Sequence, residues 1–408
     1  MSTACQDLPI STCEPCALLD PASPRVPLRS RHPTGFYIVC LAVFCERWAA
    51  YVLGSSVILM LCQRYGYSRG DALRMAGLIN AASYLGTLPG GFAIDRILDS
   101  RRSLGAGMVL LALGYGALTL SASAALWLSI PLLVFGHALF KPSTQVLIAR
   151  LYSPNDVRLD AAQIAFYFAV NAGAAMGAGI AGFFMRSLEW RGAFAMAAAV
   201  MLAGRIGLAL SRDSLRLQPK SQAVPTPSSR ATNSLSRAQR IKAIGALMLA
   251  TIIYTVGFGQ VEGSLFLWAQ ERTDRVLLGF EIPAAWFVGL PGLLVLVLAP
   301  VQLALLPRIQ RQISTQRLIG WGMVVLALAF AVLIPPAILS PGHHVSMAWL
   351  IACATLLVIA ELLVAPLGLS MILSLAPPRF VGLIVGCWYV AGAVGYWLAG
   401  EIGAAWVQ

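Results

Sequence analysis

The sequence contains few charged residues. Asp, Glu, Lys and Arg make up 11% of its 408 residues, whereas they supply roughly 25% of an average soluble domain. Hydrophobic residues make up 58%, and apolar stretches of about 20 residues, the length that crosses a bilayer as a helix, recur along nearly the whole chain. This scarcity of charge argues against a soluble globular protein and predicts an all-α, multi-pass membrane protein.

Several motifs of catalytic and nucleotide-driven proteins are missing. There is no GxxxxGK(S/T) loop, which argues against ATP as an energy source, and no HExxH or paired Cys/His set. Cys13 and Cys16 have C-x-x-C spacing, but no second pair or His cluster accompanies them. The eight cysteines form no closely spaced framework. We therefore expect no enzyme activity, cofactor, metal site or structural disulfide.

Eleven segments are expected to span the membrane. They are Thr34–Cys62, Asp71–Ile97, Ser103–Ser123, Ala125–Leu151, Ala161–Met185, Gly192–Leu210, Ile244–Ala269, Pro283–Leu306, Leu318–Leu339, Ser346–Leu375 and Phe380–Val407. Residues 1–33 are rich in Pro, Ser and Cys and lack a cleavable apolar core, so they predict a disordered cytoplasmic tail and no signal peptide.

One break in composition divides the chain. In residues 211–239, Ser, Pro, Thr, Arg and Lys replace the apolar runs, which predicts a basic cytoplasmic linker. The linker separates an N-terminal six-helix bundle, residues 34–210, from a C-terminal bundle of five expected helices, residues 240–408. Two six-helix bundles joined by such a loop are the architecture of major facilitator transporters. A twelfth helix, which that architecture would include, is not found.

The net charge of +12 is explained by membrane orientation, so no nucleic-acid partner is expected. With the N-terminus in the cytoplasm, the linker and most arginines lie inside: Arg25, Arg29, Arg31, Arg96, Arg101, Arg102, Arg150, Arg158, Arg308, Arg311, Arg317 and Arg379. The outer loops carry fewer, chiefly Arg64, Arg69, Arg186, Arg191, Arg272 and Arg275. Positive charge on the inner side favours this orientation, and we expect it in the cell (inner) membrane.

A few ionisable residues fall inside the expected spans: Glu46, Arg47, Lys141, Glu262 and Glu361. Each is costly in lipid unless it lines water or meets a partner. Lys141 is therefore expected to face a cavity and a carboxylate, with Glu46 the nearest by depth. These groups are either ion pairs that hold helices together or a polar central site, and we favour the site. There, Arg47 and Lys141 would bind the carboxylate of a zwitterionic ligand and Glu361 its amine.

Aromatic residues occur near these charges. Tyr51 follows Arg47 by one turn, Tyr84 lies in the second span, and Trp388 lies in the eleventh. Tyrosine and tryptophan in membrane proteins commonly belong to interfacial belts or helix packing. Each of these three residues could equally line a pocket.

Five segments resemble motifs of the proton-dependent oligopeptide transporters, a branch of the major facilitator superfamily. They occur in that family's order and cover most of the chain: FCERWAAYVLG at 44–54, GGFAIDR at 90–96, HALFKPSTQVLIARLY at 137–152, FYFAVNAGA at 166–174 and ELLVAPLGLSMILSLAPPRFVGLIVGCWYVAGAVGYWLAG at 361–400. The resemblance implies proton-driven symport of di- and tripeptides, or related small amphoteric solutes, by alternating access. It implies peptide-like solutes, protons and the lipid bilayer as partners, and we expect a monomer.

The resemblance also assigns roles to single residues. It places Lys141 on the family's fourth-helix lysine, Asn171 on a polar position of the fifth helix, Glu361 on the acid that faces the peptide amine, and Trp388 on the pocket tryptophan. Asp95 and Arg96 match the loop whose charges latch helix ends during gating. Proton coupling would then rest on Glu46, held in balance by Arg47 and Lys141, while Tyr51 and Tyr84 would line the substrate site.

The sequence departs from the family pattern at several positions. Val43 replaces the first acid of a Glu-x-x-Glu-Arg group, and Ala50 replaces one of two neighbouring pocket tyrosines. Pro291 and Gly292 stand where the family has Asn-Pro, and Glu262 fits the seventh-helix motif, as a substrate or gating residue, only if one residue is skipped.

These departures leave two other readings open. A pocket stripped of polar groups at Val43, Ala50 and Pro291 suggests a transporter of a specialised peptide-like metabolite with altered or lost proton coupling. The lost acid and the unseen twelfth helix would also suit a membrane sensor or scaffold that kept the fold without transport.

Overall fold

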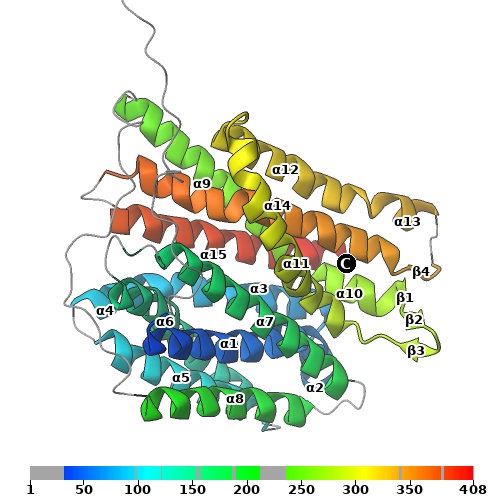
Figure 1. Cartoon of the computed structure of the whole chain (residues 1–408). Helices are drawn as coiled ribbons and strands as arrows, with labels where there is room; N and C mark the ends of the chain where they lie inside the picture. The colour runs from blue at the N-terminus through cyan, green and yellow to red at the C-terminus, as the bar shows by residue number, and fades with distance from the viewer. Residues whose placement is uncertain are drawn as a thin grey trace, which may run out of the picture.

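A computed structural model describes residues 32–96, 99–120, 122–152, 156, 158–185, 190–211, 236–339, 342–377 and 381–407. The expected N-terminal tail up to residue 31, with Cys13 and Cys16, and residues 212–235 of the expected linker lie outside this part. The described chain is almost entirely helical, and it forms the two bundles that the sequence predicts (Figure 1).

The N-terminal bundle contains eight helical segments. They are α1 (Thr34–Gly54), α2 (Val57–Tyr65), α3 (Arg69–Leu85), α4 (Thr87–Arg96), α5 (Ser100–Leu118), α6 (Ser123–Leu151), α7 (Leu159–Met185) and α8 (Trp190–Leu210). Helix α1 packs against α7 and α8, and α5 packs against α6 and α8. Glycines permit these close approaches: at Gly177, an added Cβ would lie 2.2 Å from the Trp48 carbonyl oxygen of α1.

The C-terminal bundle contains seven helical segments. They are α9 (Arg237–Gly259), α10 (Ser264–Glu271), α11 (Ala285–Gln310), α12 (Thr315–Ala331), α13 (Ile334–Leu339), α14 (Ala348–Leu375) and α15 (Val381–Trp406). Four two-residue strands, which the sequence analysis did not predict, lie in the loops at one end of this bundle: β1 (Thr273–Asp274), β2 (Val276–Leu277), β3 (Phe280–Glu281) and β4 (Val345–Ser346) (Figure 1). Strand β1 pairs in parallel with β4, and β2 pairs with β3 in antiparallel fashion.

Every expected span corresponds to one helix or to a pair of consecutive helices. Four spans are interrupted by breaks. The breaks separate α1 from α2, α3 from α4, α9 from α10, and α12 from α13. At the first break, the Ser56 hydroxyl donates to the Val52 carbonyl at 2.5 Å, a bond of the kind that bends helices. Among the described residues, nine segments are long and apolar enough to cross a membrane; α3–α4 and α5, which opens with Arg101 and Arg102, complete the eleven expected spans.

Helix α9 begins inside the segment that was expected to be the linker. Its first residue is Arg237, within the expected linker of residues 211–239 and well before Ile244, where the apolar run was expected to enter the membrane. The cause is a capping box: Ser236 accepts from the Gln239 backbone, and the Gln239 side chain accepts from the Ser236 backbone. This reciprocal pairing starts a helix in polar residues.

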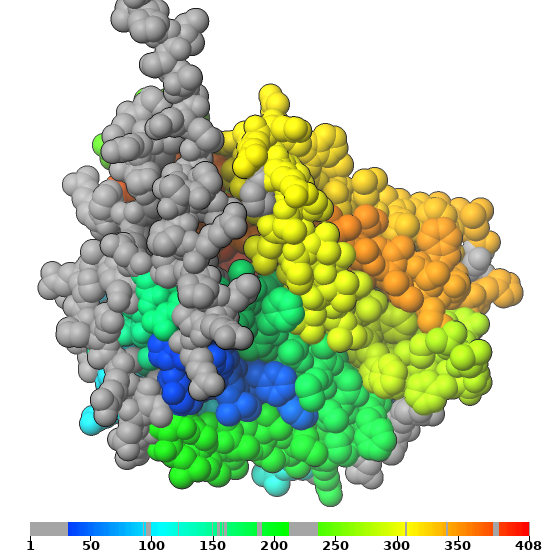
Figure 2. All heavy atoms as spheres, viewed as in Figure 1, coloured from blue at the N-terminus to red at the C-terminus, as the bar shows by residue number. Residues whose placement is uncertain are grey.

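The two bundles meet along helices that are distant in sequence. Helix α7 lies against α11, and the space-filling view shows the green and yellow surfaces of the two bundles in contact there (Figure 2). Helix α3 lies against α15, where an added Cβ at Gly77 would be 2.8 Å from the Gly400 Cα. Two ion pairs join the bundles at the same end of α3, Arg69 to Glu271 at 3.0 Å and Arg74 to Glu401 at 3.2 Å.

Candidate functional site

A cavity of about 400 Å³ lies between the two bundles. Residues of α1, α3, α5, α6, α7, α9, α11, α14 and α15 line it, so it is a central site rather than a groove within one bundle. Eight of the residues singled out from the sequence line this one cavity: Arg47, Tyr51, Tyr84, Lys141, Asn171, Glu262, Glu361 and Trp388. The cavity thus brings charged residues of both bundles together, and their role in binding stays a prediction.

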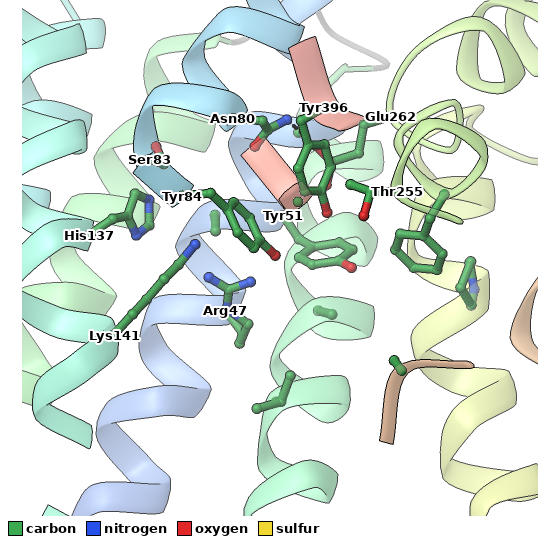
Figure 3. Close-up of a pocket in the computed structure, with 18 of the residues that line it drawn as sticks. Arg47, Tyr51, Asn80, Ser83, Tyr84, His137, Lys141, Thr255, Glu262 and Tyr396 are labelled. Carbon is green, nitrogen blue, oxygen red and sulfur yellow. Dashed lines mark hydrogen bonds between the residues drawn. The ribbon is translucent and has the colours of Figure 1, made fainter. Parts of the chain in front are cut away.

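One wall of the cavity carries cations from the N-terminal bundle. Arg47 of α1 donates from Nε to Glu46 Oε2 at 2.6 Å and also from Nη2 to Glu46 Oε1. Glu46 is 1% exposed and stands just behind the cavity wall. Lys141 of α6 does not pair with Glu46 as expected, because its Nζ lies 4.0 Å from the centre of the Tyr84 ring (Figure 3). That cation–π contact replaces the expected carboxylate.

His137 is a site residue that the sequence analysis missed. It lies one helical turn before Lys141 on α6, is 6% exposed, and lines the cavity (Figure 3). Its Nδ1 lies 3.1 Å from Glu46 Oε1, within ion-pair distance when the ring is protonated, although the two groups are not aligned as a hydrogen bond. Glu46 Oε1 therefore contacts both Arg47 and His137. The i, i+4 spacing from Lys141 was the signal that could have found it.

The opposite side of the cavity carries a carboxylate from the C-terminal bundle. Glu361 of α14 accepts one hydrogen bond from the Tyr167 hydroxyl of α7, at 3.1 Å. Among the described residues it forms no ion pair, so it keeps acceptor capacity for a cation in the cavity. Asn171 lines the cavity, but its amide donates to the Tyr167 carbonyl at 2.9 Å. Tyr167 was not singled out from the sequence.

A second carboxylate from the C-terminal bundle reaches across to the N-terminal one. Glu262 lies at the break between α9 and α10 and accepts from the Asn80 amide of α3 at 3.1 Å. It also lies against α1, where an added Cβ at Gly54 would be 2.6 Å from the Glu262 Cδ. Any side chain at position 54 would require this carboxylate to move. Glu262, placed by skipping one residue of the motif, does line the site.

Aromatic side chains complete the lining. The Trp388 indole donates from Nε1 to the Thr251 hydroxyl at 2.6 Å, which ties α15 to α9. The rings of Tyr84 and Tyr396, on α3 and α15, lie 4.9 Å apart at the bundle interface. These residues also line the cavity, so their side chains both pack helices together and form part of the pocket wall.

The positions that depart from the family pattern fall in two places. Val43 is buried in the core of the N-terminal bundle at 3% exposure. Ala50 and Pro291 line the cavity, where they present methyl and ring carbons in place of polar groups. Asp95 and Arg96 end α4, but their side chains lie outside the described part of the structure, so their gating role stays a prediction.

Residues 39–400 match the sequence model of the Major Facilitator Superfamily. The chain belongs to this superfamily. The two-bundle fold and the arrangement of a central cavity between the bundles agree with that assignment. By its membership in this superfamily, the chain is a multi-pass membrane transporter.

Relatives of this major facilitator protein are peptide transporters. It is 26% identical to the peptide transporter YePEPT of Yersinia enterocolitica, over 91% of this chain and 88% of the relative. It is 27% identical to the dipeptide and tripeptide permease A of Pectobacterium carotovorum, over 91% of this chain and 83% of the relative. The resemblance inferred from the five motifs is confirmed.

Solved structures share the fold. A peptide transporter POT in complex with sulfate superposes with a TM-score of 0.83 at 23% identity, over 91% of this chain and 88% of that one. A POT family transporter in complex with 5-aminolevulinic acid superposes with a TM-score of 0.82 at 23% identity, over 91% of this chain and 90% of that one. The major facilitator-type fold predicted from the sequence is thereby confirmed.

Proposed function

We propose that this protein is a proton-coupled symporter of di- and tripeptides, or of related small amphoteric solutes, which works as a monomer by alternating access. The observation that carries the proposal is the division of charge in the cavity. The cations Arg47 and Lys141 come from the N-terminal bundle, and the carboxylates Glu262 and Glu361 come from the C-terminal bundle. A ligand with charges of both signs would bridge the two bundles.

The cavity fits a small peptide in size and charge. A volume of about 400 Å³ is within the usual range for small-molecule sites. The ligand carboxylate would bind Arg47 and Lys141, and it would give Lys141, whose Nζ lies over the Tyr84 ring, a partner of opposite charge. The ligand ammonium would bind Glu361, whose other contact is the neutral Tyr167 hydroxyl. Charges buried in a membrane protein are costly without such partners.

Proton coupling would operate through Glu46. The Arg47 guanidinium is held by Glu46, so a substrate carboxylate has to compete with Glu46 for it. A proton that reaches Glu46 or His137 weakens the hold on Arg47: on Glu46 it removes the negative charge, and on His137 it creates a second cation beside Oε1. Arg47 and Lys141 then accept the substrate carboxylate. The loss of an acid at Val43 is consistent with a coupling device built from these groups and His137.

Alternating access would require the bundles to separate at the end where they now touch. The ion pairs Arg69–Glu271 and Arg74–Glu401, with the Glu262–Asn80 hydrogen bond, join them there. Asp95 and Arg96, at the far end of the second span, would latch the opposite side. We place the chain in the cell (inner) membrane with its N-terminus in the cytoplasm. The joined end then faces outward and the arginines at the start of α5 face the cytoplasm, the side on which membrane proteins concentrate positive charge.

The direct test is uptake of a labelled dipeptide into proteoliposomes that contain the full chain, with and without an inward proton gradient. We expect accumulation only with the gradient, and less of it for peptides blocked at the amine or the carboxylate. Uptake that ignores the gradient contradicts the coupling mechanism. Binding of peptides without any flux under either condition would instead identify a sensor or scaffold.

A second candidate is a transporter of a specialised peptide-like metabolite with altered coupling. Ala50 and Pro291 favour it, because both line the cavity with apolar atoms and leave space for a bulkier group. Thermal stabilisation of the detergent-solubilised protein by a ligand library separates the two candidates. Stabilisation by bulky amino-acid conjugates but not by simple dipeptides would support this second one.

A further inference from the structure

A second cavity lies between the first turn of α5 and the last turns of α8. Arg101 and Arg102 of α5 and Arg205 of α8 line it, together with Asp99 at the start of α5. The two helices pack side by side in the N-terminal bundle (Figure 1). Because these are helix ends, the cavity lies near the membrane surface, away from the central transport cavity.

Within the part of the chain that the structure describes, the guanidinium groups of Arg101, Arg102 and Arg205 form no ion pair and no side-chain hydrogen bond. The Nε of Arg205 is buried and has no acceptor. Asp99, the carboxylate of the cavity, is exposed and accepts from the Arg102 backbone at 3.2 Å, as the cap of α5. The cavity therefore holds a clear excess of positive charge.

Helix α5 makes room for the Arg205 side chain. An added Cβ at Gly105 would lie 3.1 Å from Arg205 Nε, so the guanidinium stem lies directly on the α5 backbone at this glycine. Gly105 is one turn after Arg101, and residues at this spacing share a helix face. The packing thus holds Arg205 on the face of α5 that also carries Arg101.

Uncompensated guanidinium groups in and beside a membrane helix are expensive, and an anion relieves that cost. The planar donors of arginine suit the oxygens of phosphate in particular. Basic cavities between helices at a membrane surface bind phospholipid head groups. We propose that Arg101, Arg102 and Arg205 bind the phosphate group of an anionic phospholipid.

The surface next to the arginines suits the rest of a lipid. Along α8, Leu202, Ile206 and Leu210 are 47%, 57% and 83% exposed, and they succeed one another at four-residue spacing. This spacing places them in one apolar row that ends beside the cavity. An acyl chain can lie along this row while its phosphate meets the arginines. A free phosphate ion would use the arginines but not the row.

The test is native mass spectrometry of the full chain in detergent, titrated with palmitoyl-oleoyl phosphatidylglycerol. The same titration with palmitoyl-oleoyl phosphatidylcholine measures binding by acyl chains alone, and inorganic phosphate measures the anion alone. We expect phosphatidylglycerol to bind and Arg205→Gln to weaken it about tenfold. The matched control is Arg317→Gln, which removes one exposed arginine near the start of α12 and should leave binding unchanged.

Two variants guard against misfolding. Arg102 is exposed, so Arg102→Gln keeps the fold and should weaken phosphatidylglycerol about threefold. Arg205→Lys keeps the charge without the paired donors and should recover part of the loss. Equal binding by the wild type, Arg102→Gln and Arg205→Gln, or equal binding of the two lipids, overturns the proposal. If inorganic phosphate stabilises the protein through these arginines and phosphatidylglycerol does not, the ligand of the cavity is a free phosphate ion and not a lipid.

Discussion

His137 Nδ1 and Arg47 Nη2 share one oxygen of Glu46, the first at 3.1 Å and the second through a short hydrogen bond. A carboxylate oxygen that serves two basic groups divides its charge between them. Protonation of the imidazole would strengthen the contact of Glu46 with His137 and weaken its contact with Arg47. The availability of Arg47 to a substrate would then depend on pH.

We predict that His137→Asn, which replaces the Nδ1 position with a neutral amide, removes part of the pH dependence of peptide binding. In the wild type, affinity for a dipeptide with a free carboxylate should be higher at low pH than at neutral pH, because a proton on His137 or Glu46 frees Arg47, while an amidated dipeptide should change little. Calorimetric titration at both pH values checks this. His343→Asn, in an exposed loop, is the control. A uniform loss of affinity at both pH values would mean that His137 only supports the fold.

Lys141→Ala should reduce gradient-driven uptake at least tenfold and reduce counterflow exchange less. The reason is that exchange needs substrate binding and alternating access but no net proton movement, whereas accumulation also needs the charge balance of Arg47, Lys141 and Glu46. The measurement compares both modes in the same proteoliposomes. Lys242→Ala, at an exposed position early in α9, should leave both unchanged. Equal loss of uptake and exchange would show that the lysine only holds α6 against Tyr84.

Glu361→Gln should weaken dipeptides with a free amine by about tenfold to a hundredfold, the size of a charge-assisted contact. N-acetylated dipeptides should lose far less, because they present no cation to the carboxylate. Competition against a labelled ligand gives both numbers. Glu281→Gln, at an exposed residue of the β3 loop, is the matched control. An equal loss for both ligand classes would contradict the assignment.

Gly54→Ala should destabilise the protein by about 1–3 kcal/mol and impair uptake, because the new methyl group would meet the Glu262 carboxylate at 2.6 Å. Gly116→Ala, on α5 with open space around it, should be neutral or stabilising by up to about 1 kcal/mol. Thermal unfolding and uptake are measured for both. Normal uptake by Gly54→Ala would show that Glu262 is free to move away from α1.

The sequence identified the charged site residues because charge is so rare in apolar spans. Each of Arg47, Lys141 and Glu361 is a charged residue within an apolar stretch of the sequence, and all three line one cavity. Neutral polar residues give no such contrast. Tyr167 and Asn80 contact the two carboxylates of the C-terminal bundle, but nothing local distinguishes them from tyrosines and asparagines that pack elsewhere.

Pairings and helix breaks were also beyond local reasoning. Lys141 contacts Tyr84 and not Glu46 because the packing orientation of α6 against α3 determines which side chain its ammonium group reaches. The breaks at Ser55 and at Gly86 fall within continuous apolar runs, where hydropathy has no signal. The start of α9 was readable in principle, since Ser236 and Gln239 form a known capping pattern, but the apolar run that begins later gave the stronger signal.

The contact between Gly77 and Gly400 brings backbone against backbone, with an added Cβ on either side blocked at about 3 Å. The nearest atoms to each added Cβ belong to backbone, which cannot turn aside as a side-chain rotamer can. Parting α3 from α15 therefore requires one helix to move bodily from the other, a collective motion of microseconds to milliseconds and not a picosecond rotamer change. That end of the protein would open as an all-or-none event, and its rate would set an upper limit on turnover.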